Sequence, residues 1–363
     1  MNLKQKSFLA FFLLLCISIC SCGQLSATSN SSPIQTNTAS SSMEVHFLDV
    51  GQGDSTLLQC DGQTMLIDAG NNDKADDVRN YLISKGIKKL DYVIGTHPDA
   101  DHVGGLDVII DEFDCKTIFL SDRTADTKTY QDVVRSVTQK NYQNTIPSVG
   151  TTYPLGGASF TIIAPNSNDY GSNTNDYSIG LILQHGNNRF LFTGDAEENA
   201  EEDILQNGID ISADVYKAAH HGSRTASTSA FLDAVHPAYA VISCGENNRY
   251  GHPHAQTLNE FRTRNIQVFR TDEQGAIVAS SDGNTIRWNM SPSTSWKAGE
   301  PIGSATTVAP AQTSYILNTK TKKFHLPTCR FVKSTSTENR QETTLSKERL
   351  IRDGYEPCGS CKP

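Results

Sequence analysis

The stretch that decides the fold is THPDADHVGG, residues 96–105. Two histidines and two aspartates lie within residues 97–102, directly after the apolar run 90–94, which is typical of a short strand. Imidazole nitrogen and carboxylate oxygen bind Zn²⁺ or Mn²⁺ at about 2.0–2.2 Å, so such side chains have to converge closely. A tight loop at a strand end brings neighbouring ligands together, and the paired glycines 104–105 let the following backbone pack behind them. The stretch therefore predicts a metal site on a strand-end loop.

The elements around this loop predict two sheets covered by helices. Alternating apolar residues indicate a strand at 45–50 and a hairpin over 56–68, and helical spacing follows at 76–85. Further strands are expected at 159–164, 179–185, 190–193, 239–243, 267–270 and 276–280. Further helices are expected at 132–139, 197–206, 227–234 and 255–264. Hairpin strands early in the chain and mixed elements later argue against a doubly wound parallel sheet.

Four more blocks in the same domain carry polar residues after apolar runs. They are DVGQGD (49–54), FTGD (192–195), HHGS (220–223) and YGHPH (250–254). With residues 96–105 they resemble the hydrolases of the metallo-β-lactamase fold, whose signature is His-x-His-x-Asp-His, although Asp99 stands where the second histidine usually is. This substitution and the DVGQGD block resemble the hydrolase domain of ComEC/Rec2 competence proteins over about residues 43–289. The resemblance implies a four-layer αββα sandwich, with the metal site on loops along one edge of the two sheets.

The resemblance also implies ligands for two metal sites when residues are carried over by position. The implied ligands are His97 and Asp99 for the first site, Asp101 and His102 for the second, Asp195 as the bridging carboxylate and His220 as the final ligand of the second site. Most members of the fold supply a further histidine to the first site. The only histidine in that interval is His185, which falls in an expected hairpin turn, and NDYS (175–178) occupies the neighbourhood instead. The first site is then oxygen-rich and weak, so the resemblance allows Mn²⁺ beside Zn²⁺ and one or two ions.

A divalent cation lowers the pKa of water toward about 7, which gives a nucleophile at neutral pH. Asp101 is the residue expected to orient that water. His221, His252 and His254 are expected to support the ligands or to protonate a leaving group, although each can equally be an ordinary core or surface histidine. Ser223 ends the HHGS block and Arg224 follows it, and the two offer a hydroxyl and a guanidinium to a phosphate group, although each can equally be an ordinary surface residue.

The two ends of the chain differ in composition from the main domain. Lys4 and Lys6 precede an apolar stretch, residues 8–20, that is too short for a permanent membrane span. The segment resembles a bacterial lipoprotein signal with Cys22 as the lipidated residue, and a plain secretory signal is the alternative. Residues 23–42 are rich in Ser, Thr and Asn and are expected to form a flexible tether. The mature protein is therefore expected outside the cytoplasm, anchored to the outer face of the bacterial cytoplasmic membrane.

A polar run with three prolines, residues 291–313, is expected to link the main domain to a module over residues 314–363. The module carries a paired-ligand spacing typical of a closed zinc site, and a disulfide in an oxidising exterior is the alternative. The expected zinc ligands are His325, Cys329, Cys358 and Cys361. The module resembles the small zinc-binding module of Ada methyl-phosphotriester repair proteins. His325 stands at the position of the methyl-accepting cysteine, so methyl transfer is not expected.

Charge separates the same two parts. The chain carries 31 Lys and Arg against 40 Asp and Glu, which excludes a general affinity of the whole molecule for polyanions. Residues 43–290 hold 18 Lys and Arg against 34 Asp and Glu, whereas residues 314–363 hold 10 against 5. The sequence thus favours an exported metal-dependent phosphodiesterase or nuclease whose basic module contacts DNA. A lactam, lactone or thioester hydrolase of the same fold and a non-catalytic DNA-binding lipoprotein are the alternatives.

Overall fold

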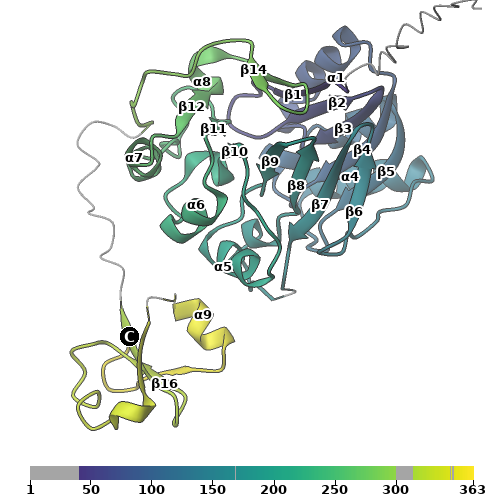
Figure 1. Cartoon of the computed structure of the whole chain (residues 1–363). Helices are drawn as coiled ribbons and strands as arrows, with labels where there is room; N and C mark the ends of the chain where they lie inside the picture. Colours follow the sequence, from purple (N-terminus) through teal and green to yellow (C-terminus); the bar gives the residue numbers. More distant parts are fainter. Residues whose placement is uncertain (1–40, 168, 300–313, 344, 346) are drawn as a thin grey trace, which may run out of the picture. The chain divides into compact units, whose positions relative to one another are not determined.

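The computed structural model describes residues 41–167, 169–299, 314–343, 345 and 347–363. Two seven-stranded sheets form the main domain (Figure 1). The first sheet has the order β14-β13-β1-β2-β3-β4-β5, and its strands are β1 (Met43–Phe47), β2 (Thr56–Cys60), β3 (Gln63–Ile67), β4 (Lys89–Gly95), β5 (Asp114–Leu120), β13 (Ile277–Ser281) and β14 (Ile286–Trp288). The second has the order β12-β11-β10-β9-β8-β7-β6, with β6 (Thr152–Leu155), β7 (Ala158–Ala164), β8 (Gly180–His185), β9 (Asn188–Phe192), β10 (Val215–Lys217), β11 (Tyr239–Ile242) and β12 (Gln267–Arg270).

The two sheets pack face to face through an aromatic and aliphatic core. Phe47 of β1 stacks on Phe192 of β9, with ring centroids 6.2 Å apart, and Tyr92 of β4 meets Phe160 of β7 edge-on at 5.0 Å. These side chains belong to one buried cluster that takes residues from both sheets. Because strands in the middle of each sheet are covered on both faces, β4 is buried along most of its length, and its C-terminal half, residues 92–95, is uncharged.

Helices cover the outer face of each sheet. A second buried cluster joins the first sheet to α1 (Ala75–Ser84), α3 (Leu106–Glu112) and α4 (Lys128–Gln139). A third joins the second sheet to α5 (Glu198–Gln206), α6 (Ser229–Val235) and α7 (Ala255–Thr263). The short helices α2 (Ala100–Val103) and α8 (Thr271–Gln274) follow β4 and β12. The expected αββα sandwich is confirmed, and the strands and helices predicted from periodicity lie within a few residues of their observed bounds.

One boundary differs from the expectation. Residues 291–299, expected to begin a linker, hydrogen-bond to the main domain: Ser293 N donates to Val268 O (2.7 Å) and Gly299 N donates to Pro253 O (2.9 Å). Trp296 packs against the third cluster. The main domain therefore extends past residue 290, because a polar, proline-containing segment can still pair its backbone with a strand end. The rest of that linker, residues 300–313, lies outside the described residues.

The module at the C-terminal end has a small four-stranded sheet of order β17-β15-β16-β18. Its elements are β15 (Tyr315–Asn318), β16 (Lys323–His325), β17 (Arg340–Thr343), α9 (Lys347–Arg352) and β18 (Glu356–Pro357). Two small apolar clusters stabilise it, one around Phe324 and Leu350 and one that contains Cys329 and Cys358. We refer to residues 314–363 as the tail module.

The expected signal segment with Cys22 and nearly all of the tether lie outside the described residues. Among the helices that the structure describes, none combines the length and the apolar character needed to cross a bilayer.

Candidate metal centre

The loop after β4 carries the first half of the site. The chain leaves β4 at Gly95 and turns back at once as α2, for which Asp99 is the residue before the first turn. This reversal is tight, since a Cβ on Gly104 would lie 2.4 Å from both Ala100 O and Asn72 N. The glycine-rich turn of residues 51–54 packs against the same loop, where Asp54 N donates to Asp101 O (3.0 Å). A Cβ at Gly53 would likewise lie 2.4 Å from Asp101 O, so only glycine fits at Gly53 and Gly104. These two glycines therefore fix the path of the loop.

The second half of the site comes from a strained turn after β10. Within η3 (Ala219–Gly222), His220 has φ 47° and His221 has φ 54°, followed by Gly222 at φ 79°. Left-handed backbone in two adjacent non-glycine residues costs on the order of 1–2 kcal/mol each. The turn is held by Ala219 N, which donates to the Tyr216 hydroxyl (3.0 Å), and by His220 N, which donates to Gly194 O (3.2 Å). This geometry sends the two neighbouring imidazoles in different directions.

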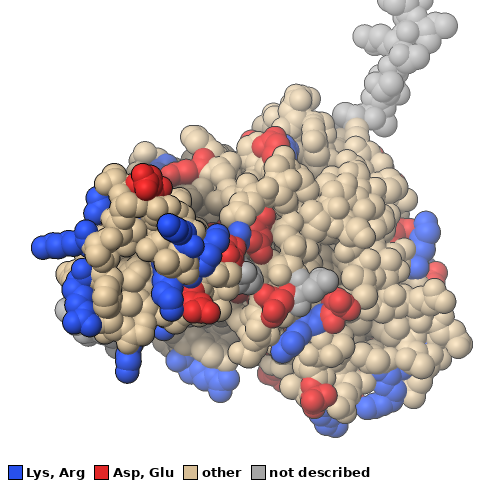
Figure 2. Space-filling model, turned by 90° about the horizontal axis from the view of Figure 1, so that it is seen from below, with Lys and Arg blue, Asp and Glu red and all other residues tan. Residues whose placement is uncertain are grey.

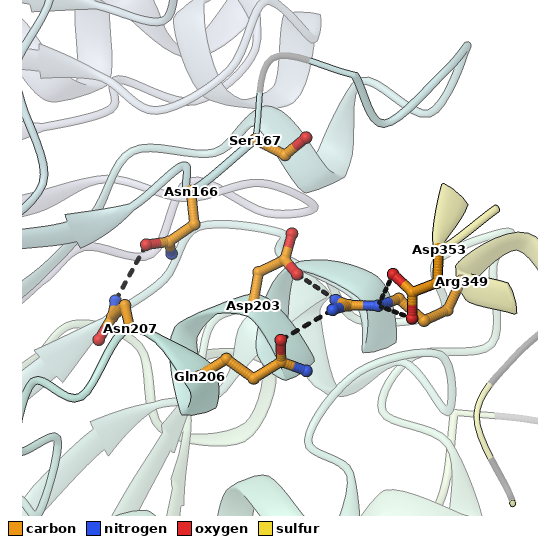
Figure 3. A pocket seen from close by; sticks show the side chains of 7 residues that line it. All are labelled: Asn166, Ser167, Asp203, Gln206, Asn207, Arg349 and Asp353. Atoms are coloured by element: carbon orange, nitrogen blue, oxygen red, sulfur yellow. Dashed lines mark hydrogen bonds and ion pairs between the residues drawn. The ribbon is translucent and has the colours of Figure 1, made fainter. Parts of the chain in front are cut away.

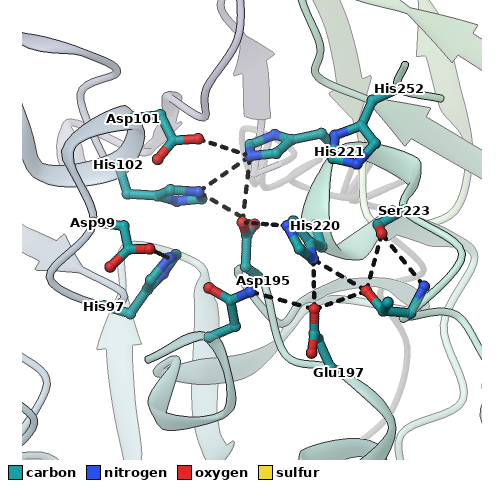
Figure 4. A network of polar contacts seen from close by, with 12 residues as sticks. His97, Asp99, Asp101, His102, Asp195, Glu197, His220, His221, Ser223 and His252 are labelled. Atoms are coloured by element: carbon teal, nitrogen blue, oxygen red, sulfur yellow. Dashed lines mark hydrogen bonds and ion pairs between the residues drawn. The ribbon is translucent and has the colours of Figure 1, made fainter. Parts of the chain in front are cut away.

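Side chains from these two halves converge with Asp195, which follows β9 (Figure 4). His102 Nε2 lies 3.2 Å from Asp195 Oδ1, and His221 Nε2 lies 3.3 Å from Asp195 Oδ2 and 3.4 Å from Asp101 Oδ2. The Nε2 atoms of His102 and His221 are 3.4 Å apart. Four ligand atoms placed about 2.1 Å from one cation in a tetrahedral site lie about 3.4 Å from each other. The observed separations therefore fit a ligand set for a divalent cation.

Hydrogen bonds at the far side of each ring fix the tautomers. His102 Nδ1 lies 2.8 Å from Asp68 Oδ2, and His221 Nδ1 lies 3.0 Å from Ser243 O. Because a carboxylate and a carbonyl can only accept, both Nδ1 atoms carry a proton, so Nε2 is the atom that faces the centre and that offers a lone pair when the ring is neutral. Burial lowers the pKa of each ring, but neighbouring carboxylates, Asp195 first, raise the pKa of both well above the ordinary value. The centre thus stabilises positive charge.

His97 adds a third inward nitrogen. Thr96 Oγ1 gives its one proton to Asp68 Oδ2 (2.8 Å), so it can only accept from His97 Nδ1, 3.1 Å away. The ring is buried, and its Nε2 has no hydrogen-bond partner among the described residues. Burial, followed by the nearby His102, lowers the pKa of His97 to about 4, so the ring is neutral. An unpartnered buried lone pair beside two carboxylate ligands fits a metal-binding role.

The oxygen-rich side expected near His97 is also present. Asp99 Oδ2 lies 4.0 Å from His97 Nε2, and burial raises the pKa of Asp99. Asn175 lines the same pocket, in η2 (Asn175–Tyr177), and Ser178 Oγ accepts from Asp195 N (3.1 Å). His185 lies at the end of β8, where its ring nitrogens face Ser281 Oγ and Ser41 Oγ. No histidine of the described chain takes the place that most relatives of this fold fill.

The adjacent histidines differ from the expected assignment. His220, carried over as the final ligand, directs Nδ1 to Glu197 Oε1 (2.9 Å), and its Nε2 lies 3.8 Å from Asp195 Oδ2. His221, expected in a supporting role, has its Nε2 among the other donors. The geometry therefore favours His221 as the ligand of that site and places His220 at the rim, 23% exposed.

The remaining predicted residues separate into two groups. His252 lines the pocket, and its Nδ1 lies 3.4 Å from Gln52 Nε2. His254 instead accepts from Arg224 N through Nδ1 (2.9 Å), and Ser223 Oγ is bonded within its own turn to Thr225 Oγ1 (2.9 Å). Neither His254 nor Ser223 lines the pocket, so the structure does not bring them to the metal ligands. The residues that line it are Gln52, Asp99, Asp101, Asn175, Asp195, His220, His221, Tyr250 and His252.

Sequence reasoning missed the buried charges behind the ligands. Lys217 Nζ lies 2.7 Å from Asp54 Oδ2, and Asp54 Oδ1 lies 3.2 Å from His221 Nδ1. Burial would raise the pKa of Asp54, but Lys217 and then His221 lower it to about 2. The signals were a lone lysine inside an apolar strand and a carboxylate at the strand end, Asp68, which holds His102. These residues orient the ligands.

The tail module has a second convergent set. The donor atoms of His325, Cys329, Cys358 and Cys361 all lie within 4.8 Å of one another, and His325 Nδ1 is 3.5 Å from Cys329 Sγ. All described cysteines are free thiols. Burial raises the pKa of the Cys358 thiol, but hydrogen bonds from backbone N–H groups, that of Cys361 first, lower it, and the pKa lies below its ordinary value. A disulfide uses two of these groups, whereas a tetrahedral zinc site uses all four.

Further polar side chains, drawn in Figure 3, have a different character. In the main domain, Asn207 Nδ2 donates to Asn166 Oδ1 (3.0 Å), and in the tail module Arg349 Nε donates to Asp353 Oδ1 (3.1 Å). In each part the two side chains are hydrogen-bonded to one another, and neither pair includes a histidine or a cysteine. We assign no chemistry to them.

Comparison with known proteins gives the following similarities. Residues 48–157 match the family described as the Metallo-beta-lactamase superfamily. The chain is 30% identical over 256 residues to ComE operon protein 3 of Bacillus subtilis (66% of this chain, 33% of that protein). It is 29% identical over 243 residues to Recombination protein 2 of Haemophilus influenzae (64% and 28%) and 29% identical over 231 residues to competence protein ComA of Neisseria gonorrhoeae (63% and 31%). The chain thus spans about a third of the length of these relatives. The crystal structure of the metallo-beta-lactamase fold protein YhfI from Bacillus subtilis is 14% identical, with a TM-score of 0.46 over 66% of this chain and 99% of that one.

Proposed function

Because the main domain is a metallo-β-lactamase domain related to competence proteins, a hydrolase fold that binds divalent metals, we propose that this chain is a metal-dependent phosphodiesterase acting on DNA. The observation that carries the proposal is the convergence of the Nε2 atoms of His102 and His221 with Asp101 and Asp195 at 3.2–3.4 Å. Similarity to competence and recombination proteins and the cationic tail module support a nucleic-acid substrate.

The proposed ligands of the two metal positions follow from the geometry. Asp101, His102 and His221 would hold one cation, and His97 and Asp99 would hold the other. Asp195 would be shared, because its oxygens lie 3.2 Å from His102 Nε2 and 3.3 Å from His221 Nε2 and its charge also acts on His97 and Asp99. A bound divalent cation supplies Lewis acidity and makes water nucleophilic near neutral pH. Zn²⁺ and Mn²⁺ both suit this mixture of imidazole and carboxylate donors.

Side chains of the pocket orient the water and the substrate through hydrogen bonds. Asp101 is 25% exposed at the pocket, and the carboxylate oxygen that does not face the ligand set would accept a hydrogen bond from the attacking water and thereby orient it. Gln52 Oε1 accepts from Gly245 N, so its amide nitrogen is the donor that faces His252 Nδ1. His252 therefore carries its own proton on Nε2. Burial and the neighbouring His221 lower the pKa of His252 to about 3, so the ring offers that N–H as a neutral hydrogen-bond donor to a substrate oxygen.

In this proposal the tail module contributes to DNA binding. Zn²⁺ held by its one histidine and three cysteines would stabilise a module whose apolar core is too small to do so alone. Figure 2 shows Lys and Arg side chains gathered on the tail module. Exposed cations there, such as Lys320, Lys322, Arg330 and Lys333, would contact phosphates without reading sequence.

The test uses the full chain reconstituted with Mn²⁺ or Zn²⁺ and fluorescent single- and double-stranded DNA. Cleavage is expected with either strand form and is expected to fall at least about 100-fold in His221→Ala. The control is His236→Asn, an exposed histidine outside the pocket. Turnover of nitrocefin or a thioester without DNA cleavage, or DNA cleavage unaffected by His221→Ala, would contradict the proposal.

Placement outside the cytoplasm is part of the proposal and rests on the sequence around Cys22. Cys22→Ala is expected to release the protein from the membrane fraction of expressing bacteria. Equal membrane partitioning of both proteins would remove the lipid anchor from the proposal.

A further inference from the structure

An exposed aromatic side chain stands at the mouth of the metal pocket. Tyr250 lies in the loop between β11 and α7 and is 49% exposed, although it lines the same pocket as the proposed metal ligands. The other exposed large apolar side chains of the described residues are Ile83, Val134, Ile146, Phe331 and Ile351. None of them lines that pocket. Burial of apolar area therefore does not explain the position of Tyr250.

The loop that carries Tyr250 is held in shape from within. Asn248 Oδ1 accepts from Tyr250 N (3.1 Å) and from His252 N (3.0 Å). Asn248 Nδ2 donates to Gly245 O (2.9 Å) and to His252 O (2.6 Å). One half-buried amide thus fixes both ends of the segment, so the ring of Tyr250 is presented by a pre-organised backbone.

Planar groups lead from the metal ligands to the surface. The rings of His221 and His252 have centroids 5.9 Å apart, and those of His252 and Tyr250 stack with centroids 5.7 Å apart and an interplanar angle of 19°. The Arg249 guanidinium carbon lies 4.8 Å from the Tyr250 centroid, and Arg249 Nη2 donates to the Tyr250 hydroxyl (2.6 Å). Arg249 is exposed. The series ends in a flat surface with a positive charge.

The charges of the pocket make this surface the place for a planar, anionic substrate. The pocket walls carry Asp99, Asp101 and Asp195, which repel an anion wherever a cation does not compensate them. Arg249 supplies a positive charge at the mouth, and an aromatic ring next to a guanidinium is the type of surface on which nucleobases stack. Peptides and lipids offer no such regular planar group beside a phosphate.

We propose that Tyr250 and Arg249 form a stacking platform for the nucleobase next to the scissile phosphate. This inference rests on the proposed phosphodiesterase function and narrows its substrate to base-bearing single strands or unpaired ends. Bases inside a duplex are stacked on their own neighbours and can reach the platform only after unpairing. Tyr250 and Arg249 thus determine specificity, while the reacting atoms remain with the pocket residues.

The test compares two oligonucleotides that differ only in their bases. One is a fluorescent single-stranded thymidine oligonucleotide, and the other has the same length and phosphates but abasic sites. Binding to the zinc-loaded full chain is measured by anisotropy with Ca²⁺ in place of Mn²⁺, so that the pocket carboxylates are compensated and the tail module keeps its zinc, and KM and kcat are measured with Mn²⁺. Stacking of one base contributes about 1–3 kcal/mol, so Tyr250→Ala is expected to reduce the preference for the base-bearing oligonucleotide about 5- to 150-fold, mainly through Kd and KM.

Two control variants separate stacking from other effects. Tyr250→Phe keeps the ring and loses only the hydroxyl bonded to Arg249, so it should keep most of the preference. Arg287→Ala removes an exposed arginine elsewhere and controls for net charge, against which Arg249→Ala is compared. Thermal unfolding of each variant should be near that of the wild type, since Tyr250 is half exposed.

Each outcome decides the proposal. Loss of the preference in Tyr250→Ala with retention in Tyr250→Phe supports it. Equal losses on both oligonucleotides, or no loss, overturn it. If the wild type cleaves neither oligonucleotide, the phosphodiesterase proposal fails, and the anisotropy comparison by itself still decides whether Tyr250 stacks bases.

Discussion

Replacing Lys217 by Met should destabilise the main domain strongly. Lys217 is 3% exposed and pairs with Asp54, which is 7% exposed, at 2.7 Å. Removing one partner of a buried ion pair costs about 3–5 kcal/mol because the other charge stays buried. In a domain of this size 1 kcal/mol corresponds to about 2–4 °C, so Tm is expected to fall by roughly 6–20 °C.

The assay follows urea unfolding by tryptophan fluorescence in the presence of EDTA. Both tryptophans, Trp288 and Trp296, lie in the main domain, so the signal does not report on the tail module. EDTA removes the contribution of metal binding to the apparent stability. The control is Lys74→Met, whose ammonium lies 3.3 Å from an Asp77 carboxylate that is 61% exposed, so that its loss leaves no buried charge and should cost less than about 1 kcal/mol.

A double-mutant cycle tests the reasoning itself. Asp54→Asn neutralises the other partner, so the variant with both substitutions should be more stable than the sum of the single effects predicts, by about 2–4 kcal/mol. A cost of Lys217→Met below 1 kcal/mol, or additive single effects, would refute the view that this pair is a buried, mutually dependent unit.

Four further outcomes are expected. His221→Ala should weaken metal binding at least about 100-fold and His220→Ala less than 10-fold, measured by competition with a chelator, because His221 Nε2 lies 3.3 Å from Asp195 Oδ2, whereas His220 Nε2 lies 3.8 Å from it and the ring is held by Glu197. Gly104→Ala should cost roughly 1–3 kcal/mol in urea unfolding, since its Cβ would meet backbone atoms at 2.4 Å. Cys358→Ser should abolish the ligand-field bands of the Co²⁺-substituted tail module, which a disulfide would not produce. Burial raises the pKa of Glu201 from 4.5 to about 7. The protonated side chain therefore contributes stability that is fully present below about pH 4.5 and is lost as the pH rises through 7. Between pH 4 and 8 the wild type should lose roughly 3 kcal/mol of unfolding free energy relative to Glu201→Gln.

The fold could be predicted from the sequence where periodicity and loop chemistry agree. Helix α7 and the β2–β3 hairpin follow from apolar spacing and turn residues alone. The strands β5 and β10 were missed: β5 alternates with charged residues, and β10 is three residues long and contains Lys217. Short helices such as α2 are set by the close packing of glycines and have no pattern of their own.

The candidate site could be predicted as a set of residues but not as an arrangement. Residues 96–105 indicated a metal loop because four donors lie close together in the sequence. Which of His220 and His221 faces the site depends on the left-handed backbone of both residues. Two adjacent histidines give no sign of that backbone in the sequence. The pairing of Lys217 with Asp54 joins residues far apart in the chain, so no local pattern predicts it.

The division of the ligands between two sheets links assembly of the domain to ion affinity. His97, Asp101 and His102 follow β4 of one sheet, whereas Asp195 and His221 follow β9 and β10 of the other. Neither sheet alone gathers the full set of donors, so an ion that occupies the site acts as a clamp across the Phe47–Phe192 interface. Any change that loosens this hydrophobic contact will weaken ion affinity without touching a ligand, and a tightly held ion will rescue such a variant.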